Sequence, residues 1–219
     1  MSPDPMKLVA DYQGPKRGAD RAVLLAHGAG ADRNAQALRA VADALADAKI
    51  PSLRFDYPYV TAKRRSPNSA SVLDRATRDA AAELARRSGL PAERLVLGGR
   101  SMGGRYCSQI VGDAEVPVPA LGLLLLGYPL HPAGQPDRLR VDHFPRLHVP
   151  CLFVSGTRDS LGSQAALAKA TKKIKGPVDM HWLETADHGF RPVKASGRTL
   201  PDVVAEVARV STEWVLSLR

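Results

Sequence analysis

Short apolar runs alternate with longer amphipathic stretches along almost the whole chain. Runs with the length of buried strands lie at 22–26, 52–55, 94–97, 121–126, 151–155 and 179–183, and helical patterns lie at 34–48, 74–87, 164–174 and 201–218. Strands joined through helices pair in parallel. The order therefore predicts an α/β fold, with a mainly parallel sheet flanked by helices on both faces.

The segment between the strands at 121–126 and 151–155 decides the domain organisation. It holds about two dozen residues rich in Pro, His and Arg, which are too few for an independent lid. The same alternation continues after it, and no second domain is visible. We expect no cap domain, and we expect residues 1–219 to form a single domain with an open site.

The charge balance raises the question of an anionic partner, because 31 Lys and Arg against 22 Asp and Glu give a net charge of +9. The basic residues are scattered, however, in short clusters such as Lys63–Arg65, Arg86–Arg87 and Lys172–Lys173, and aromatic residues make up only 5%. This pattern favours a solvated basic surface over a nucleic-acid interface. No heptad seam or exposed patch predicts an oligomeric state.

The cysteine count and the length of the apolar runs indicate in which cellular compartment the protein is expected. Two cysteines, Cys107 and Cys151, are too few for a disulfide framework or a four-cysteine zinc site, and no His pair has zinc-protease spacing. The longest apolar run, 121–126, is far shorter than the roughly 18 residues that span a bilayer. Residues 1–7 carry an acid and two prolines where an export signal needs a basic start. We expect a cytoplasmic protein without metal, cofactor or membrane partner.

A glycine-rich turn, Gly99-Arg100-Ser101-Met102-Gly103, follows the predicted strand at 94–97 and precedes a predicted helix that reaches about Gly112. It matches G-x-S-x-G, in which a strained strand-to-helix turn presents a serine hydroxyl as a nucleophile. The glycines make room for such a turn. Taken alone, the turn is equally consistent with Ser101 merely capping the helix.

A serine nucleophile needs a base that takes its proton and a carboxylate that holds the base. Asp159 follows the predicted strand at 151–155, and His188 follows the predicted strand at 179–183. Both lie after strand ends, on the carboxyl edge of the sheet where Ser101 is also expected. Convergence of the three residues predicts a catalytic Ser101, Asp159 and His188.

Other residues compete for these roles. Among the six histidines, the second choice of base is His143, which precedes the strand that delivers Asp159 and so has a different chain order. Asp187 is the second choice of acid. It directly precedes His188 and would have to fold back to reach the ring, so Asp159 is preferred.

The strand at 22–26 ends in a second glycine-rich segment, His27-Gly28-Ala29-Gly30. In this architecture the segment lies opposite the nucleophile turn, where backbone N–H groups of Ala29 and Met102 are expected to bind an oxyanion. His27 is expected to order the loop. The alternative reading of the segment is a tight turn before a helix.

The run from Ala22 to Phe190 resembles the alpha/beta-hydrolase superfamily and, within it, small hydrolase-like proteins of the testis-expressed type, which are related to dienelactone hydrolases. The resemblance rests on six blocks: Leu-Ala-His-Gly-Ala-Gly ending at Gly30, Arg-Phe-Asp-Tyr-Pro-Tyr ending at Tyr59, Gly-Gly-Arg-Ser-Met-Gly-Gly-Arg ending at Arg105, Leu-Gly-Tyr-Pro-Leu-His-Pro starting at Leu126, Ser-Gly-Thr-Arg-Asp ending at Asp159, and Asp187-His188.

The resemblance implies a triad of Ser101, Asp159 and His188, with Met102 and a residue of the loop at Ala29 as oxyanion donors. Dienelactone hydrolases carry a cysteine nucleophile, so Ser101 departs from their pattern. The group is also similar to a subunit of a nuclear histone-acetyltransferase complex, in which the hydrolase-like domain implies a role in assembly.

These residues predict a serine hydrolase that cleaves a small-molecule carboxylic ester or thioester through an acyl-enzyme. The alternative is a catalytically inactive binding or assembly module, and the retained Ser, Asp and His favour the enzyme. The arginines that flank the motifs would favour an anionic substrate or serve the structure; they are Arg33, Arg100, Arg105 and Arg158.

Overall fold

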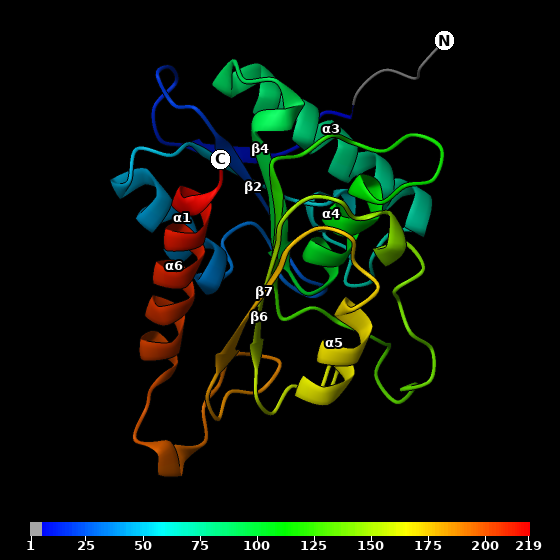
Figure 1. Ribbon diagram of the computed structural model, residues 1–219. Helices are drawn as coiled ribbons and strands as arrows, with labels where there is room; N and C mark the ends of the chain where they lie inside the picture. Colours follow the sequence, from blue (N-terminus) through cyan, green and yellow to red (C-terminus); the bar gives the residue numbers. More distant parts are fainter. Residues whose placement is uncertain (1–5) are drawn as a thin grey trace.

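A seven-stranded sheet runs through the centre of the molecule, with helices on both of its faces (Figure 1). The computed structural model describes residues 6–219, so the part of the export-signal prediction that rests on residues 1–5 lies outside the described residues. The strand order is β1-β3-β2-β4-β5-β6-β7. Only β1 is antiparallel to its neighbour, and the other five strand pairs are parallel.

The elements alternate as the sequence predicts. The strands are β1 Ala10–Gln13, β2 Ala22–Ala26, β3 Ser52–Phe55, β4 Leu95–Arg100, β5 Gly122–Leu126, β6 Cys151–Gly156 and β7 Val178–Leu183. The α-helices are α1 Gln36–Asp47, α2 Pro58–Thr61, α3 Ala70–Ser88, α4 Met102–Val111, α5 Gln164–Thr171 and α6 Leu200–Ser217. Three short 3-10 turns lie at Ala92–Arg94, Phe144–Arg146 and Lys194–Ser196.

Side chains of the parallel strands point alternately into two hydrophobic cores. Val23 and Leu25 of β2 join the core beneath α1 and α6, whereas Leu24 joins the core beneath α3, α4 and α5. Figure 1 shows α1 and α6 on one side of the sheet and the other three helices on the opposite side. Because both faces are covered, the central strands are almost wholly apolar.

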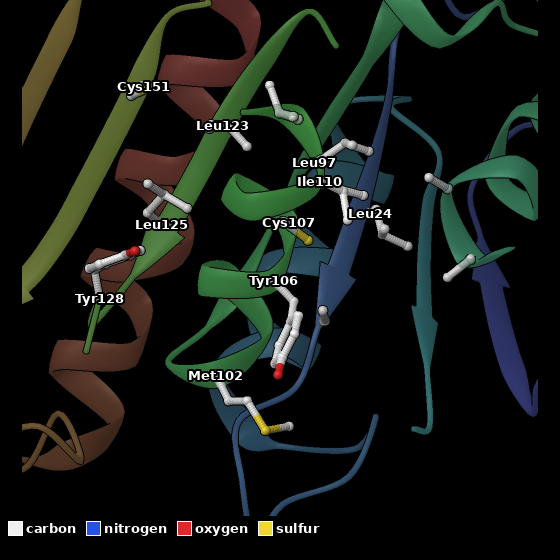
Figure 2. Close-up of a cluster of buried hydrophobic side chains, with 14 of the residues drawn as sticks. Leu24, Leu97, Met102, Tyr106, Cys107, Ile110, Leu123, Leu125, Tyr128 and Cys151 are labelled. Carbon is white, nitrogen blue, oxygen red and sulfur yellow. The ribbon is translucent and has the colours of Figure 1, made fainter. Parts of the chain in front are cut away.

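Helix α4 packs directly on the central strands. Figure 2 shows Cys107 and Ile110 of α4 beside Leu24 of β2 and Leu97 of β4, and all four side chains are fully buried. The Cys107 thiol donates a hydrogen bond to the Gly98 carbonyl oxygen at 3.2 Å. This packing fixes the start of α4, where the candidate nucleophile lies.

The elements that differ from the sequence prediction include β1, α3 and the unpredicted α2. Strand β1 is not predicted, because Ala10–Gln13 is a half-buried edge strand of only four residues. Helix α3 begins at Ala70 rather than near Asp74, because Ala70, Ser71, Val72 and Leu73 already form its first turn. The connection 127–150 carries only the 3-10 turn at Phe144–Arg146 and forms no separate cap over the described residues, as expected.

Within residues 6–219, no helix is long and apolar enough to cross a membrane. Nor does any group of three or more His, Cys, Asp or Glu side chains in that range have an arrangement that could hold a metal ion. Cys107 and Cys151 are both unpaired and buried.

Candidate active site

Ser101 lies on the sharp turn between β4 and α4. Its backbone has φ 50° and ψ −114°, which few residues other than glycine adopt. Its N–H donates to the Leu126 carbonyl oxygen at 2.9 Å, and its carbonyl accepts from the Arg105 N–H at 3.0 Å. The turn is therefore held by the neighbouring strand and by the first turn of the helix.

The glycines around Ser101 are required by close backbone contacts. A Cβ atom on Gly99, whose φ is 149°, would lie 2.0 Å from the Ala26 carbonyl oxygen. A Cβ atom on Gly103 would lie 2.3 Å from the same oxygen. Strand β2 thus approaches the turn so closely that only glycine fits at both positions.

The structure brings together the three residues that the sequence predicts at the carboxyl edge. The Ser101 Oγ atom lies 3.0 Å from His188 Nε2, and His188 Nδ1 lies 2.8 Å from Asp159 Oδ2. The carboxylate can only accept, so Nδ1–H donates to Asp159 and leaves Nε2 to accept from the Ser101 hydroxyl. The arrangement permits a proton to pass from the serine to the ring.

Asp159 is held more firmly than the ring that it contacts. Its side chain is fully buried, whereas the His188 side chain is 25% exposed. Its second oxygen, Oδ1, accepts from the Leu161 N–H at 2.8 Å. The competing acid, Asp187, instead accepts from the Arg191 backbone N–H at 2.9 Å.

The loop after β2 is ordered by His27, which is fully buried. The Tyr57 N–H donates to His27 Nε2 at 3.1 Å, so Nδ1 carries the proton and donates to the Gly28 carbonyl oxygen at 2.8 Å. Burial lowers the pKa of His27 and favours this neutral form. The Gly28 carbonyl thus points toward the ring, and in a trans peptide the Ala29 N–H points the opposite way.

A cavity of about 390 Å³ joins Ser101 and His188 to the loop that contains Ala29. Small apolar side chains form part of its wall, among them Ala35 just before α1, Ala37 of α1 and Val204 of α6. Met102 begins α4, where its backbone N–H has no partner within the helix. The cavity therefore has room for a short apolar group beside the serine hydroxyl.

Arg100 connects the loops around the site. Its guanidinium lies 4.3 Å from the centre of the Phe190 ring, and Phe190 has a left-handed φ of 65°. Nη1 donates weakly to the Leu126 carbonyl at 3.5 Å. Burial lowers the pKa of Arg100 to about 10, against the opposing effect of the Asp159 and Asp187 carboxylates, so Arg100 is cationic at neutral pH.

The other flanking arginines differ in their surroundings. Arg33 forms ion pairs with Asp11 and the buried Asp56, which ties the loop after β2 to β1 and β3. Arg105 lies over the Tyr106 ring and donates to Gln109, which indicates a structural role for it as well. Arg158 is exposed next to Asp159.

His143, the second choice of base, lies away from Ser101. It is 5% exposed, and its Nε2 donates to Ser108 Oγ at 2.8 Å, while the Ser108 hydroxyl donates to the Arg105 carbonyl. Burial, with the nearby charges of Arg146 and Arg105, lowers the pKa of His143 to about 4. This pair joins the connection after β5 to α4.

The family sequence model described as alpha/beta hydrolase domain matches residues 19–216, so the chain belongs to this family.

Solved structures of similar fold include an alpha-beta serine hydrolase homologue from Coxiella burnetii, with a TM-score of 0.71 and 16% identity over 94% of this chain and 90% of that one. A dienelactone hydrolase from Anabaena variabilis has a TM-score of 0.70 and 21% identity, over 98% and 94% of the two chains. A thermophilic esterase from Thermogutta terrifontis has a TM-score of 0.67 and 17% identity, over 95% and 93%. At these identities the likeness shows the shared fold.

Proposed function

We propose that the protein is a serine hydrolase that cleaves a carboxylic ester or thioester of a small molecule. The observation that carries the proposal is the chain of two hydrogen bonds from Ser101 through His188 to the buried Asp159. A serine at a structural helix cap has no need of such a chain. Strain at Ser101 is also typical of a nucleophile turn.

The proposed reaction is acyl transfer in two halves. His188 Nε2 takes the Ser101 proton as Oγ attacks the carbonyl carbon, and the resulting oxyanion accepts hydrogen bonds from the Ala29 and Met102 N–H groups. The imidazolium then gives its proton to the departing alkoxide or thiolate. In the second half, water loses a proton to His188 and attacks the acyl-enzyme, which releases the acid and restores Ser101.

The roles of the remaining groups follow from the same geometry. Asp159 holds the His188 ring in the required tautomer and stabilises its charged form. Arg100 acts as a positioning residue, because it contacts Phe190 two residues after His188. No cofactor or metal takes part in the proposed steps.

We also propose a subfamily, a single-domain organisation and a cytoplasmic location for the protein. The Gly-Gly-Arg-Ser-Met-Gly-Gly-Arg and Leu-Gly-Tyr-Pro-Leu-His-Pro blocks support membership of the testis-expressed type of hydrolase-like protein. A single sheet that carries strands from Ala10 to Leu183 supports one domain over 1–219. Two free cysteines support a reducing, cytoplasmic compartment.

Hydrolysis of p-nitrophenyl acetate, followed in the pre-steady state, tests the proposal. We expect a burst of one p-nitrophenol per chain, as the acyl-enzyme accumulates. Ser101→Ala and Asp159→Asn lower kcat by about 10⁴-fold, since each removes part of the proton-transfer chain.

Asp187→Asn is the matched control, because an amide oxygen still accepts from the Arg191 N–H, whereas the ring bonds to Asp159. It leaves kcat within a few-fold of the wild type. Absence of turnover by a folded wild type would favour the alternative, a hydrolase-like binding or assembly module.

A further inference from the structure

The cavity at Ser101 adjoins a second and larger one. The second cavity has a volume of about 820 Å³ and lies beside the loop that follows β2. Ala31 and Ala35 line both cavities, so the two hollows meet at this loop. A substrate whose carbonyl lies at Ser101 can therefore extend into the second cavity.

Three consecutive cations, Lys63, Arg64 and Arg65, line the second cavity. All three are exposed, and in the described part of the chain no carboxylate pairs with their side chains. They directly follow the short helix α2, and the backbone is held against it, because the Lys63 N–H donates to Val60 and the Arg64 N–H donates to Tyr59. The three cations are thus carried on an ordered backbone and have no carboxylate partner.

Cations outnumber acids strongly around the two cavities together. Lys63, Arg64, Arg65, Arg100 and Arg191 line them with Asp32 as the one carboxylate, whereas the whole chain has 31 basic and 22 acidic residues. Asp32 is held by the Asn34 N–H, which donates to its Oδ1 at 2.7 Å. An anionic group would therefore be attracted to this region.

Another cavity is lined by more acidic than basic residues, so the strong excess of basic over acidic residues is a local property of the two cavities near Ser101. A cavity of about 610 Å³ next to α4 is lined by Arg146 and four acids, of which Asp74 and Asp113 pair with Arg78; the other two are Glu115 and Asp142. The net charge of +9 is thus not spread evenly over the hollows of the surface. Positive charge gathers beside the nucleophile.

We infer that the substrate is an ester or thioester carrying a phosphate or carboxylate group remote from the scissile carbonyl, which lies against Lys63, Arg64 and Arg65. The inference rests on the proposed hydrolase function and names its substrate class. Arg33 is paired with Asp56 and Arg105 donates to Gln109, so both have partners within the fold. The unpaired cations at 63–65 are therefore the better anion site. The chemical steps remain those of acyl transfer at Ser101.

Two matched pairs of substrates test the inference. The acyl arm compares p-nitrophenyl hexanoate with the p-nitrophenyl half-ester of adipic acid, which has the same number of acyl carbons. The leaving-group arm compares butyryl-CoA with the butyryl thioester of N-acetylcysteamine. In each arm the measured quantity is the ratio of kcat/KM for the anionic member to kcat/KM for the neutral member.

The test variant is Lys63→Asn, Arg64→Gln, Arg65→Gln, in which asparagine suits the left-handed φ of 55° at position 63. We expect the ratio to exceed one in at least one arm and to fall about tenfold in this variant, through KM, because each exposed ion pair changes affinity up to a few-fold. Raising NaCl to about 1 M has the same effect on the wild type.

The control variant removes three charges elsewhere, with Lys169→Gln, Lys172→Gln and Lys173→Gln at the exposed end of α5. It leaves the ratio unchanged. Equal rates for both members of both pairs, or a preference that the test variant retains, would overturn the inference.

Labelling of Ser101 by a fluorophosphonate distinguishes a failure of the proposed substrate class from a failure of the proposed hydrolase function. A wild type that labels but shows no anionic preference refutes the substrate class alone. A wild type that neither labels nor hydrolyses any of the four substrates refutes the hydrolase function as well.

Discussion

Ser101 shows how the neighbours of one residue hold an unfavourable backbone. Its φ of 50° and ψ of −114° lie in a region that costs of the order of 1–3 kcal/mol for a residue with a side chain. The turn persists because β2 lies against it, with Ala26 too close for any residue but glycine at positions 99 and 103. Strain and crowding therefore occur at the same turn.

Gly103→Ala tests this crowding. The new Cβ would lie 2.3 Å from the Ala26 carbonyl oxygen, so strand and helix must separate. We expect the free energy of unfolding in urea to fall by about 3 kcal/mol, at the upper end for overpacked sites. Gly134→Ala is the control, because nothing lies within 4 Å of its Cβ position and only its φ of 70° opposes the change. Equal losses in the two variants would contradict the crowding explanation.

His143 makes stability depend on pH. Its pKa is about 4 in the folded chain against an ordinary 6.5, so the unfolded chain binds the proton more readily. Stability from this residue is fully present above pH 6.5 and is lost as the pH falls toward 4. Over this interval the wild type should lose about 3 kcal/mol more than His143→Gln, which cannot titrate.

His148→Gln is the matched control for this effect, because His148 is exposed and lies in the same connection. Its free energy of unfolding should follow that of the wild type from pH 7 to pH 4. Parallel curves for His143→Gln and the wild type would show that the buried ring contributes nothing to the acid sensitivity.

At the level of elements, the hydrophobic pattern predicts the six parallel strands and five of the helices, with ends that differ by a few residues. Strand β1 escapes prediction, because Ala-Asp-Tyr-Gln is only four residues long and is defined by its pairing with β3. The same holds for α2, which spans only Pro58–Thr61. Elements that depend on distant partners leave little trace in their own residues.

The candidate site also has a part that the sequence predicts and a part that it does not. Ser101, Asp159 and His188 are predictable because each follows a strand end, and parallel strands bring their carboxyl ends to one edge. Two other features cannot be predicted from the sequence: the contact of Arg100 with Phe190, and the position of Ala31 in the walls of both cavities. Both depend on how loops far apart in the sequence fold against each other. The only sequence signal for the contact between Arg100 and Phe190 is that Phe190 lies two residues after His188.

Helix α6 depends on a capping box at its start. The Thr199 side chain accepts from the Asp202 N–H, and Asp202 accepts from the Thr199 N–H at 2.7 Å. Thr199→Ala removes the first bond, so we expect a loss of about 1 kcal/mol of unfolding free energy. Thr199→Ser keeps the hydroxyl and restores most of it. A loss of the same size in both variants would exclude the cap as the cause.

The whole molecule protects both thiols. Burial raises the pKa of Cys151 to about 12 and raises that of Cys107 well above its ordinary value. Neither should react with iodoacetamide at pH 8 in the folded protein, and both should react fully in urea, as intact mass reports. A cysteine placed on the exposed face of α5 by Ala165→Cys should react at once. Rapid modification of Cys107 would mean that α4 separates from the sheet in native conditions.

The central claim is that Ser101 is an activated nucleophile, and labelling with a fluorophosphonate probe followed by mass spectrometry tests it without a choice of substrate. The account predicts one adduct per chain, mapped to Ser101, absent in Ser101→Ala, strongly reduced in His188→Gln and retained in Ser160→Ala. A folded wild type that stays unlabelled, or carries its adduct on another residue, would contradict the account.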